Sequence, residues 1–346
     1  LDSWFKIWLL MSKKIIYVAI FFLSAAIFSQ EPKNLGSLFY KEVTADIETE
    51  PVFVADDAAD DMCVLENKTD PDKSLIISSD KKYGIIVYNL DGKKLYDYPV
   101  GRVNNVDIIE SKGRFYVAGT NRTKNNIEIY EFGIDGQLQS TLISENVQSL
   151  KDVYGITFYN GNQEKYLFVS DKKGNVEQWR IELDRPDPKI YLTRKLRFSS
   201  LVEGIVSDEK NNVVFIGQEK KGIWKIDPIN PYVEKELIYK KNKFMRPDFE
   251  GLALREDENN NGYIVASVQG SNGYLLLDRL DYTPKLFFRV VDSAEIDGTT
   301  ETDGIEVSNI KTKKFPNGFF IAQDDDNDGL NQNFKIVDWN KIKLNE

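Results

Sequence analysis

Carboxylate side chains recur at one position of a repeating sequence pattern. An acidic residue stands just before an apolar run in four successive repeats, at Asp152, Glu203, Asp248 with Glu250, and Asp303. If these runs are equivalent strands around one axis, the carboxylates face a shared channel. A single acid at such a place would be unremarkable. Four in equivalent positions predict a ring of oxygen ligands of the kind that a calcium cluster requires.

Residue counts narrow the chemistry that such a channel can perform. The 346 residues include no His and one Cys, Cys63. Without His, a Ser-His-Asp triad, a phosphohistidine mechanism and an ordinary His-ligated zinc site are excluded. Hard cations held by oxygen remain, and calcium is the first of these.

Three further acidic segments are candidates for binding a cation. Residues 56–61 carry four carboxylates in six positions, which repel one another unless they are solvated or bind a cation. Residues 324–329 fit the pattern D-x-D-x-D-G, and residues 257–262 fit D-x-N-x-N-G. Both lack the bidentate Glu of an EF-hand loop, since Lys335 and Val268 stand there. We expect calcium at residues 324–329, a solvated turn at 257–262, and either outcome at 56–61.

Cationic side chains occupy a second set of recurring positions. Lys81, Lys82, Arg122 and Lys172 lie in polar turns between apolar runs, and Glu219 lies in an equivalent turn. Equivalent turns of a closed ring fall on one end face, so these residues are expected to converge around one channel mouth. The alternative is that the charged turns are simply solvated.

Six β-hairpins would position these turns. Residues 75–77 and 85–88 are apolar and flank the charged turn 79–84, a pattern that predicts a β-hairpin. The same pattern recurs in the segments 115–130, 166–181, 213–226, 263–277 and 319–337. A period of roughly 40–50 residues built from strands alone predicts a β-propeller. We therefore expect an all-β, single-domain, six-bladed β-propeller, with residues 30–55 as a ring-closing strand or a loose arm.

The N-terminal segment has the features of an export signal. Lys13 and Lys14 precede the apolar run 15–28, which is shorter than the roughly 20 residues of a transmembrane helix. We expect residues 1–29 to comprise an upstream stretch before Met11 and a cleaved signal peptide, and residues 30–346 to form the propeller. The mature protein would then be secreted or periplasmic, with no membrane attachment, and we expect a monomer.

The charge balance also bears on partners. The formal net charge is −10, and it becomes −10 − 2 = −12 without residues 1–29, which carry three Lys and one Asp. No dense Lys/Arg run is present, so we expect no nucleic-acid partner.

In combination, short motifs from about residue 50 to the end resemble those of the β-propeller phytases. The matching segments are 60–61, 80–84, 101–107, 121–122, 153–155, 177–179, 203–204, 222–225, 248–252, 266–270, 297–305 and 331–337. The chain departs from that family at Met62, where Pro is frequent, and at Lys173, where an acidic residue is common.

The resemblance implies a calcium-dependent phosphatase that hydrolyses myo-inositol hexakisphosphate (phytate) or its calcium salt, with several calcium ions and a metal-activated water as nucleophile. It implies active-site calcium ligands at Asp61, Glu203, Glu219, Asp248, Glu250 and Asp303, to which we add Asp60 of the same motif. It implies ligands of a tighter, structural calcium at Asp297, Asp324 and Asp326. The phosphate-contacting residues would be Lys81, Lys82, Arg122, Tyr154 and Lys172, and the residues expected to carry catalysis are Glu203, Lys81, Arg122, Tyr154 and Lys172.

Two other functions remain open from the residues alone. A calcium-dependent, lactonase-like propeller hydrolase would use one central calcium and few cations at the rim. A non-catalytic propeller that binds a protein or glycan would leave the acidic ring unexplained. The cations Lys81, Lys82, Arg122 and Lys172 argue against the first of these.

Overall fold

The computed structural model describes residues 38–162, 164–242, 245–246 and 248–344. The expected signal peptide in residues 1–29, and residues 30–37 after it, lie outside the described residues. Among the helices that are described, none has the length and apolar character needed to cross a membrane.

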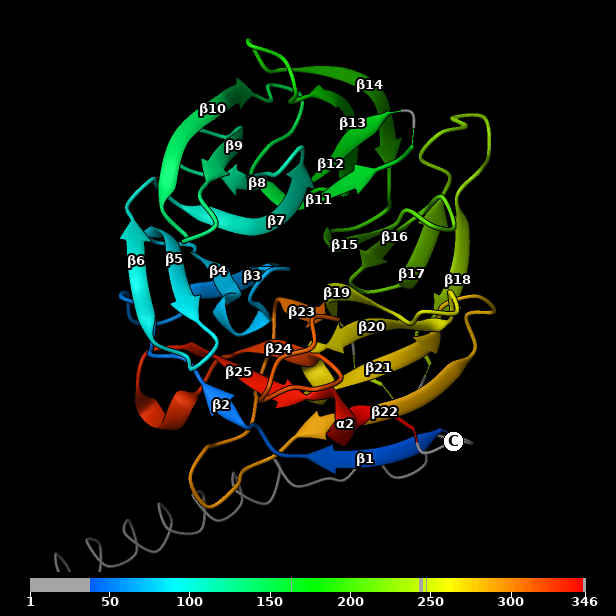
Figure 1. Ribbon diagram of the computed structural model, residues 1–346. Helices are drawn as coiled ribbons and strands as arrows, with labels where there is room; N and C mark the ends of the chain where they lie inside the picture. The colour runs from blue at the N-terminus through cyan, green and yellow to red at the C-terminus, as the bar shows by residue number, and fades with distance from the viewer. Residues whose placement is uncertain (1–37, 163, 243–244, 247, 345–346) are drawn as a thin grey trace, which may run out of the picture. The chain divides into compact units, whose positions relative to one another are not determined.

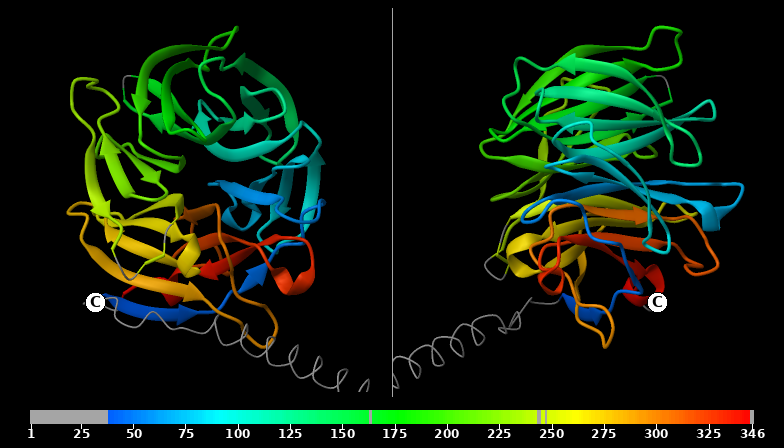
Figure 2. Two further views of the ribbon diagram at one scale, coloured as in Figure 1. Left: turned by 180° about the vertical axis from the view of Figure 1, so that it is seen from behind. Right: turned by 90° about the vertical axis from the view of Figure 1, so that its left-hand side faces the viewer.

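Six β-sheets form a ring, which Figure 1 and Figure 2 show from three directions. Residues from one strand of each sheet line a central channel. The innermost strands of the six sheets are β3 (Ala59–Leu65), β7 (Val103–Ser111), β11 (Val153–Asn160), β15 (Val202–Asp208), β19 (Phe249–Glu256) and β23 (Ile305–Ser308). Each contacts the innermost strands of both neighbouring blades. The last of these contacts joins the sixth blade to the first. The predicted six-bladed, all-β propeller is confirmed.

The strands follow one another outward within each blade. The first two blades comprise β3 (Ala59–Leu65), β4 (Leu75–Asp80), β5 (Gly84–Asn89) and β6 (Lys94–Tyr98), then β7 (Val103–Ser111), β8 (Arg114–Asn121), β9 (Asn126–Phe132) and β10 (Leu138–Asn146). The third and fourth comprise β11 (Val153–Asn160), β12 (Lys165–Asp171), β13 (Asn175–Glu182) and β14 (Lys189–Arg197), then β15 (Val202–Asp208), β16 (Val213–Gln218), β17 (Gly222–Ile226) and β18 (Glu236–Lys240). The fifth comprises β19 (Phe249–Glu256), β20 (Gly262–Val268), β21 (Gly273–Asp278) and β22 (Pro284–Val290), and the sixth contains β23 (Ile305–Ser308), β24 (Phe319–Asp324) and β25 (Asn333–Asp338). The described helices are short: η1 (Pro71–Lys73), η2 (Gln269–Ser271), η3 (Asn327–Gly329) and α2 (Trp339–Ile342).

Two strands from the N-terminal side complete the last blades. β2 (Ile47–Glu48) pairs antiparallel with β25 and supplies the fourth strand of the sixth blade. β1 (Phe39–Val43) pairs parallel with β22 at the outer edge of the fifth blade. Residues 30–55 therefore contain a ring-closing strand, one of the two alternatives expected from the sequence.

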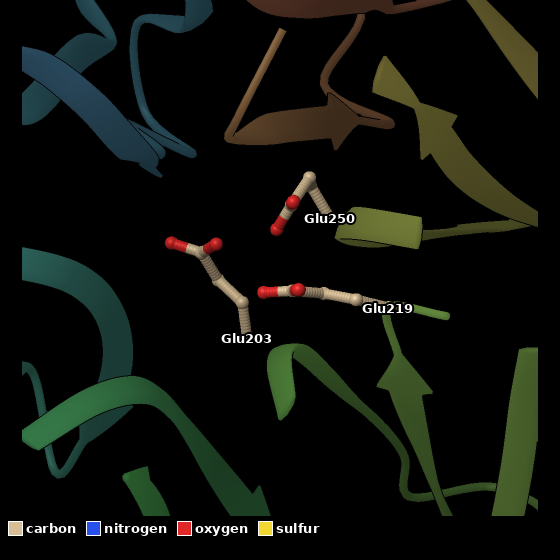
Figure 3. Close-up of side chains that lie close together, drawn as sticks. All are labelled: Glu203, Glu219 and Glu250. Atoms are coloured by element: carbon tan, nitrogen blue, oxygen red, sulfur yellow. The ribbon is translucent and has the colours of Figure 1, made fainter. Parts of the chain in front are cut away.

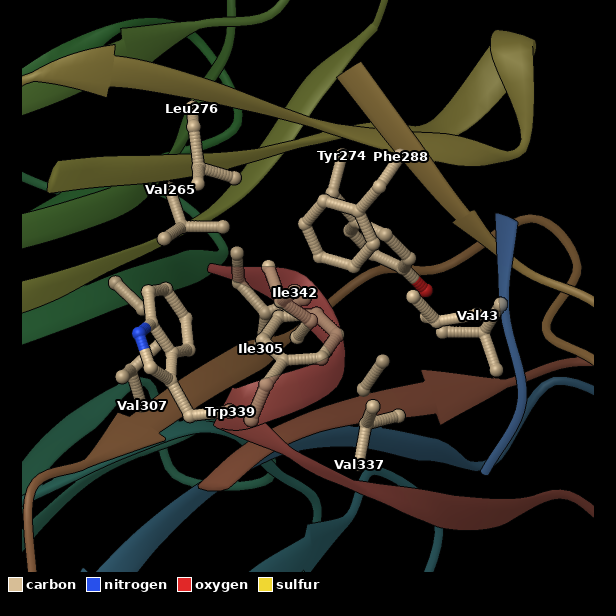
Figure 4. Packing of buried hydrophobic residues seen from close by; sticks show 14 of the residues in the cluster. Val43, Val265, Tyr274, Leu276, Phe288, Ile305, Val307, Val337, Trp339 and Ile342 are labelled. Atoms are coloured by element: carbon tan, nitrogen blue, oxygen red, sulfur yellow. The ribbon is translucent and has the colours of Figure 1, made fainter. Parts of the chain in front are cut away.

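Apolar side chains fill the spaces between neighbouring blades. Figure 4 shows one such cluster, in which Phe288 and Val265 of the fifth blade face Val307 and Val337 of the sixth. Trp339 of α2 joins the same cluster, so the C-terminal segment packs into it. Ring closure and these clusters stabilise a chain whose only Cys, Cys63, is a buried free thiol.

Candidate active site

A repeated irregularity in strand pairing turns polar residues into the channel. In five blades the register between the innermost strand and its neighbour breaks near the start of the strand, between residues 59 and 62, 103 and 106, 153 and 156, 202 and 205, and 249 and 252. Such bulges re-aim side chains that regular alternation would send to opposite faces. The residues within them include Asp60 and Asp61, Asn104 and Asn105, Tyr154, Glu203 and Glu250.

Glycines after these polar residues allow the innermost strands to approach closely. A Cβ atom on Gly204 would lie 2.0 Å from the carbonyl oxygen of Glu250, and one on Gly304 would lie 2.4 Å from that of Asp60. Any side chain at either position would push neighbouring blades apart. The glycines therefore keep the side chains of different blades within reach of one another.

Three carboxylates meet at the centre of the channel mouth. Glu203, Glu219 and Glu250 each offer an oxygen within 4.8 Å of the others, and Figure 3 shows their side chains pointing toward one another. All three are buried. Burial and then the charge of Glu203 raise the pKa of Glu219 to about 8, and the same two causes hold the pKa of Glu250 well above its usual range.

A second group of acids from the first and sixth blades lies beside these three. Burial raises the pKa values of Asp61 and Asp303 to about 7. It also raises the pKa of Asp60 well above the ordinary value, against the opposing effect of Lys81 and with the support of Glu203. The acids of four blades thus form one electrostatic unit.

Several oxygens of this unit have no hydrogen-bond partner. Both carboxylate oxygens of Asp60, together with Oε2 of Glu203 and of Glu250, are buried and accept no hydrogen bond from the residues that the structure describes. A buried carboxylate without a partner is costly. Oxygen-only donors at close spacing are what a hard divalent cation prefers, so these residues fit calcium.

Most of the predicted phosphate-contacting residues surround this acidic unit. Lys81 Nζ lies 2.8 Å from Asp303 Oδ2 and 2.5 Å from Asp57 Oδ1. Burial opposes the charge of Lys81, but Asp60 and Asp303 outweigh that effect and raise its pKa. Lys82 lies farther out, where it donates to the carbonyl of Ala55 at 2.9 Å.

Arg122, Tyr154 and Lys172 form the other side of the mouth. The Arg122 guanidinium is bidentate to Asp152, with Nε 2.7 Å from Oδ1 and Nη2 3.1 Å from Oδ2. Lys172 Nζ lies 4.5 Å from the centre of the Tyr154 ring. Burial and then Glu203 raise the pKa of the Tyr154 hydroxyl, so the phenol stays protonated. The expected convergence on one mouth is confirmed for Lys81, Arg122, Lys172 and Glu219.

Asp248 is not one of the three central carboxylates, and the predicted structural site contains a separate group of acids around Lys335. Asp248 is near enough to Glu219 to contribute to its raised pKa. Asp297 and Asp324 are joined by the Lys335 ammonium, which also lies 2.7 Å from Glu48 Oε2 of the closing strand. Asp326 is exposed, and its backbone N–H donates to Thr300 Oγ1.

The loop at residues 257–262 folds on itself, as expected for a solvated turn. Asp257 Oδ1 accepts from the backbone N–H groups of Asn259 and Asn261, each at 2.8 Å.

The four acids of the stretch 56–61 differ in their exposure to solvent. Asp56 and Asp57 are exposed, whereas Asp60 is buried in the channel.

The channel continues beyond Asp61 into a cavity of about 480 Å³ that is also acidic. Its lining includes Asp107, whose Oδ2 accepts from Thr157 Oγ1 at 2.8 Å and from the N–H of Phe158 at 2.6 Å. Asp107 is thus satisfied by the protein, whereas Asp60 is not. This difference assigns the candidate site to the mouth that holds Asp60 rather than to the cavity around Asp107.

Sequence reasoning assigned no specific role to two channel residues, Asn104 and Asn105. The structure places both amides in the channel, where Asn104 donates to Glu203 and Asn105 donates to Asp61. The sequence signal is positional: an Asn pair opens the second repeat where later repeats have a residue followed by Gly. Gln269, which donates to Asp303 Oδ1 at 2.7 Å, was also missed.

Comparison with known proteins gives three findings. The family model described as Phytase matches residues 11–345. A curated 3-phytase from Bacillus subtilis (strain 168) is 35% identical over 328 residues, which cover 87% of this chain and 84% of that protein. A structural genomics protein of unknown function from Bacteroides thetaiotaomicron VPI-5482 superposes with a TM-score of 0.56 at 13% identity, over 86% of this chain and 74% of that one, a likeness of fold alone.

Proposed function

The chain belongs to the phytase family and is a phytase, and we propose that it releases phosphate from phytate at this channel mouth in a calcium-dependent reaction. The observation that carries the proposal is the set of buried carboxylate oxygens on Asp60, Glu203 and Glu250 that accept no hydrogen bond within the described part of the chain. Such oxygens need a cation or a proton. The cationic side chains of Lys81, Arg122 and Lys172, which surround these acids, would bind the phosphate groups of the substrate.

Because the protein and phytate are both negatively charged, the proposed reaction requires a bound metal cation. The chain has a formal net charge of −10, and phytate is itself strongly anionic. At the mouth, the acids outnumber Lys81, Arg122 and Lys172, so the protein alone would repel the substrate. Calcium held there would neutralise phosphate oxygens and acidify water that is bound next to them. The proposed ligands are Asp60, Asp61, Glu203, Glu219, Asp248, Glu250 and Asp303.

The protein's own cations and phenol would bind and orient the phosphate groups. The Lys81 ammonium and the Arg122 guanidinium are fixed by buried contacts, so they present charge-assisted donors in a defined geometry. Arg122 can grip two phosphate oxygens with its planar fork once they displace Asp152, which is partly exposed. The protonated Tyr154 hydroxyl can donate to another phosphate oxygen. Lys82, nearer solvent, would hold a phosphate that does not react.

We also propose a structural calcium at Asp297, Asp324 and Asp326. What supports it is the pairing of Asp297 with Asp324 in the structure, at the point where the closing strand meets the sixth blade. Because Lys335 already lies between these acids, the ion would have to bind beside the ammonium. Burial raises the pKa of Asp324 to about 6, against the lowering effect of Lys335.

The leader is a separate proposal. We propose that the segment before about residue 30 is removed on export and that the mature monomer is secreted or periplasmic. Lys13 and Lys14 before the apolar run 15–28 support this. N-terminal sequencing of native protein should give a start between about residues 25 and 31. A retained Met11 would contradict it.

Phosphate release from phytate, measured with millimolar calcium and again with excess chelator, tests the proposed function. We expect release with calcium and none with chelator. Equal release in both conditions would overturn the calcium dependence. Hydrolysis of lactones without release of phosphate would favour the lactonase-like alternative, and no turnover of either substrate would favour a binding propeller.

A further inference from the structure

Asn104 connects two groups of the proposed site that come from different blades. It lies on β7 of the second blade and is completely buried. Its Nδ2 donates to Glu203 Oε1 of the fourth blade at 3.2 Å. Its Oδ1 accepts from Arg122 Nη1, on the turn after β8, at 3.2 Å. One amide therefore contacts both a proposed calcium ligand, Glu203, and a proposed phosphate-binding residue, Arg122.

The chemistry of these partners fixes the orientation of the amide. A guanidinium can only donate hydrogen bonds, and a carboxylate can only accept them. Rotating the amide by half a turn would set NH₂ against Arg122 and oxygen against Glu203. The side-chain amide of Asn has an acceptor oxygen for Arg122 and a donor nitrogen for Glu203 on the same carbon. Few other side chains of this size offer both groups.

Asn105 extends the connection to the first blade. Asn104 Nδ2 also donates to Asn105 Oδ1 at 3.0 Å, and Asn105 Nδ2 donates to Asp61 Oδ2 at 3.1 Å. Both amides can face the channel because the strand register breaks between Val103 and Val106. The result is a continuous chain of hydrogen bonds from Arg122 through the Asn pair to Asp61, with a branch to Glu203.

We propose that Asn104 is a positioning residue that sets the orientations of Arg122 and Glu203 for the reaction. This inference rests on the proposed function. Asn104 is the only amide donor to Glu203 in the described part of the chain, and Glu203 Oε2 accepts no hydrogen bond there. Arg122 is otherwise held by Asp152, whose carboxylate an incoming phosphate would displace. In the substrate complex, Asn104 would remain the protein acceptor that keeps the guanidinium in place.

The test compares Asn104→Ala with a matched control, Asn126→Ala. Asn126 is a buried amide of the same blade, and its side chain bonds to Ser144 and Asn146 rather than to the site. Loss of a group that orients a metal ligand typically costs about 10–100-fold in metal affinity or activity. We expect calcium binding, measured by calorimetry without substrate, and kcat/KM for phytate both to weaken by about that factor in Asn104→Ala only.

A double-mutant cycle separates positioning from a general structural role. If Asn104 acts through Arg122, adding Asn104→Ala to an Arg122→Ala protein should lower kcat/KM far less than it does in the wild-type background. Equal losses in both backgrounds, or calcium binding that matches the control, would overturn the proposal. If Asn104→Ala does not fold, Asn104→Ser replaces it, with a smaller loss in the same direction expected. Failure of the wild-type protein to hydrolyse phytate would remove the proposed function, while the calorimetry would still test the effect of Asn104 on Glu203.

Discussion

Lys81 and Asp303 meet across the seam of the ring, with Nζ 2.8 Å from Oδ2, although 222 residues separate them in the chain. The pair links the first blade to the sixth, next to the hydrogen bond from the N–H of Gly304 to the carbonyl of Asp60 at 2.9 Å. Both side chains are largely buried. The same lysine that is expected to hold phosphate therefore also stabilises ring closure.

Replacing Lys81 by Met should consequently destabilise the protein as well as weaken catalysis. Removal of one partner from a buried ion pair typically costs about 3–5 kcal/mol, because the remaining charge is left uncompensated. Chemical denaturation in calcium-free buffer measures this loss as a change in the free energy of unfolding.

Lys82→Met is the matched contrast. Lys82 is partly exposed, and its nearest carboxylate, that of Asp56, lies 3.7 Å away and is almost fully solvated. We expect stability to change by less than about 1 kcal/mol, as for surface ion pairs. The KM for phytate should rise more than kcat falls if this lysine holds a non-reacting phosphate. A fall in kcat at unchanged KM would contradict that role.

Glu203→Gln should abolish most hydrolysis and leave the fold intact. Gln is nearly isosteric, and its Oε1 can still accept from Asn104, but the charge expected to hold calcium is lost. We expect kcat to fall by orders of magnitude, each factor of ten being about 1.4 kcal/mol of barrier. Excess calcium should restore activity only in part.

Glu209→Gln is the control for that substitution. Glu209 lies just after β15, at the opposite end of the strand from Glu203, and is exposed. Its activity and calcium dependence should match the wild type. A Glu203→Gln protein that also matched the wild type in kcat and calcium dependence would remove Glu203 from the site.

Removal of calcium should lower the melting temperature. The proposed ligands extend from Asp60 to Asp326, and they are close together only in the folded state. At a calcium concentration 100 times the dissociation constant, one such site contributes about 2.7 kcal/mol, or roughly 4 °C for a chain of this size. Thermal melts in calcium and in excess chelator measure the difference. Identical curves would show that no ion links these segments.

Without calcium, the protein should lose stability as the pH rises toward 8. Burial raises the pKa values of Asp61 and Asp303 to about 7, and that of Glu219 to about 8. Between about pH 4 and these values the folded state binds more protons than the unfolded state, so stability falls with increasing pH. Calcium should offset the loss by replacing the protons. Melts from pH 5 to 8 in chelator test this, and a stability that rises over that range would contradict it.

The sequence alone was sufficient for the architecture. Apolar runs that alternate with polar turns predict hairpins, and six such hairpins repeated at a nearly constant period, without helices between them, are typical of a β-propeller. The turn at residues 79–84 and its five counterparts lie where the pattern predicted. The residue types also limited the chemistry, because a chain with many carboxylates and no His favours oxygen-bound cations.

Only the tertiary structure decided which acids act together. Asp57 and Asp60 are three residues apart in one acidic stretch, yet the first is exposed and the second is buried without a partner in the described part of the chain. Asp57 lies in the loop before β3, whereas Asp60 lies within the bulge between residues 59 and 62 that turns polar side chains into the channel. The link from Arg122 through Asn104 to Glu203 is likewise a product of ring closure. It joins residues of two blades that are not adjacent in the sequence, and no local pattern encodes a contact across the channel.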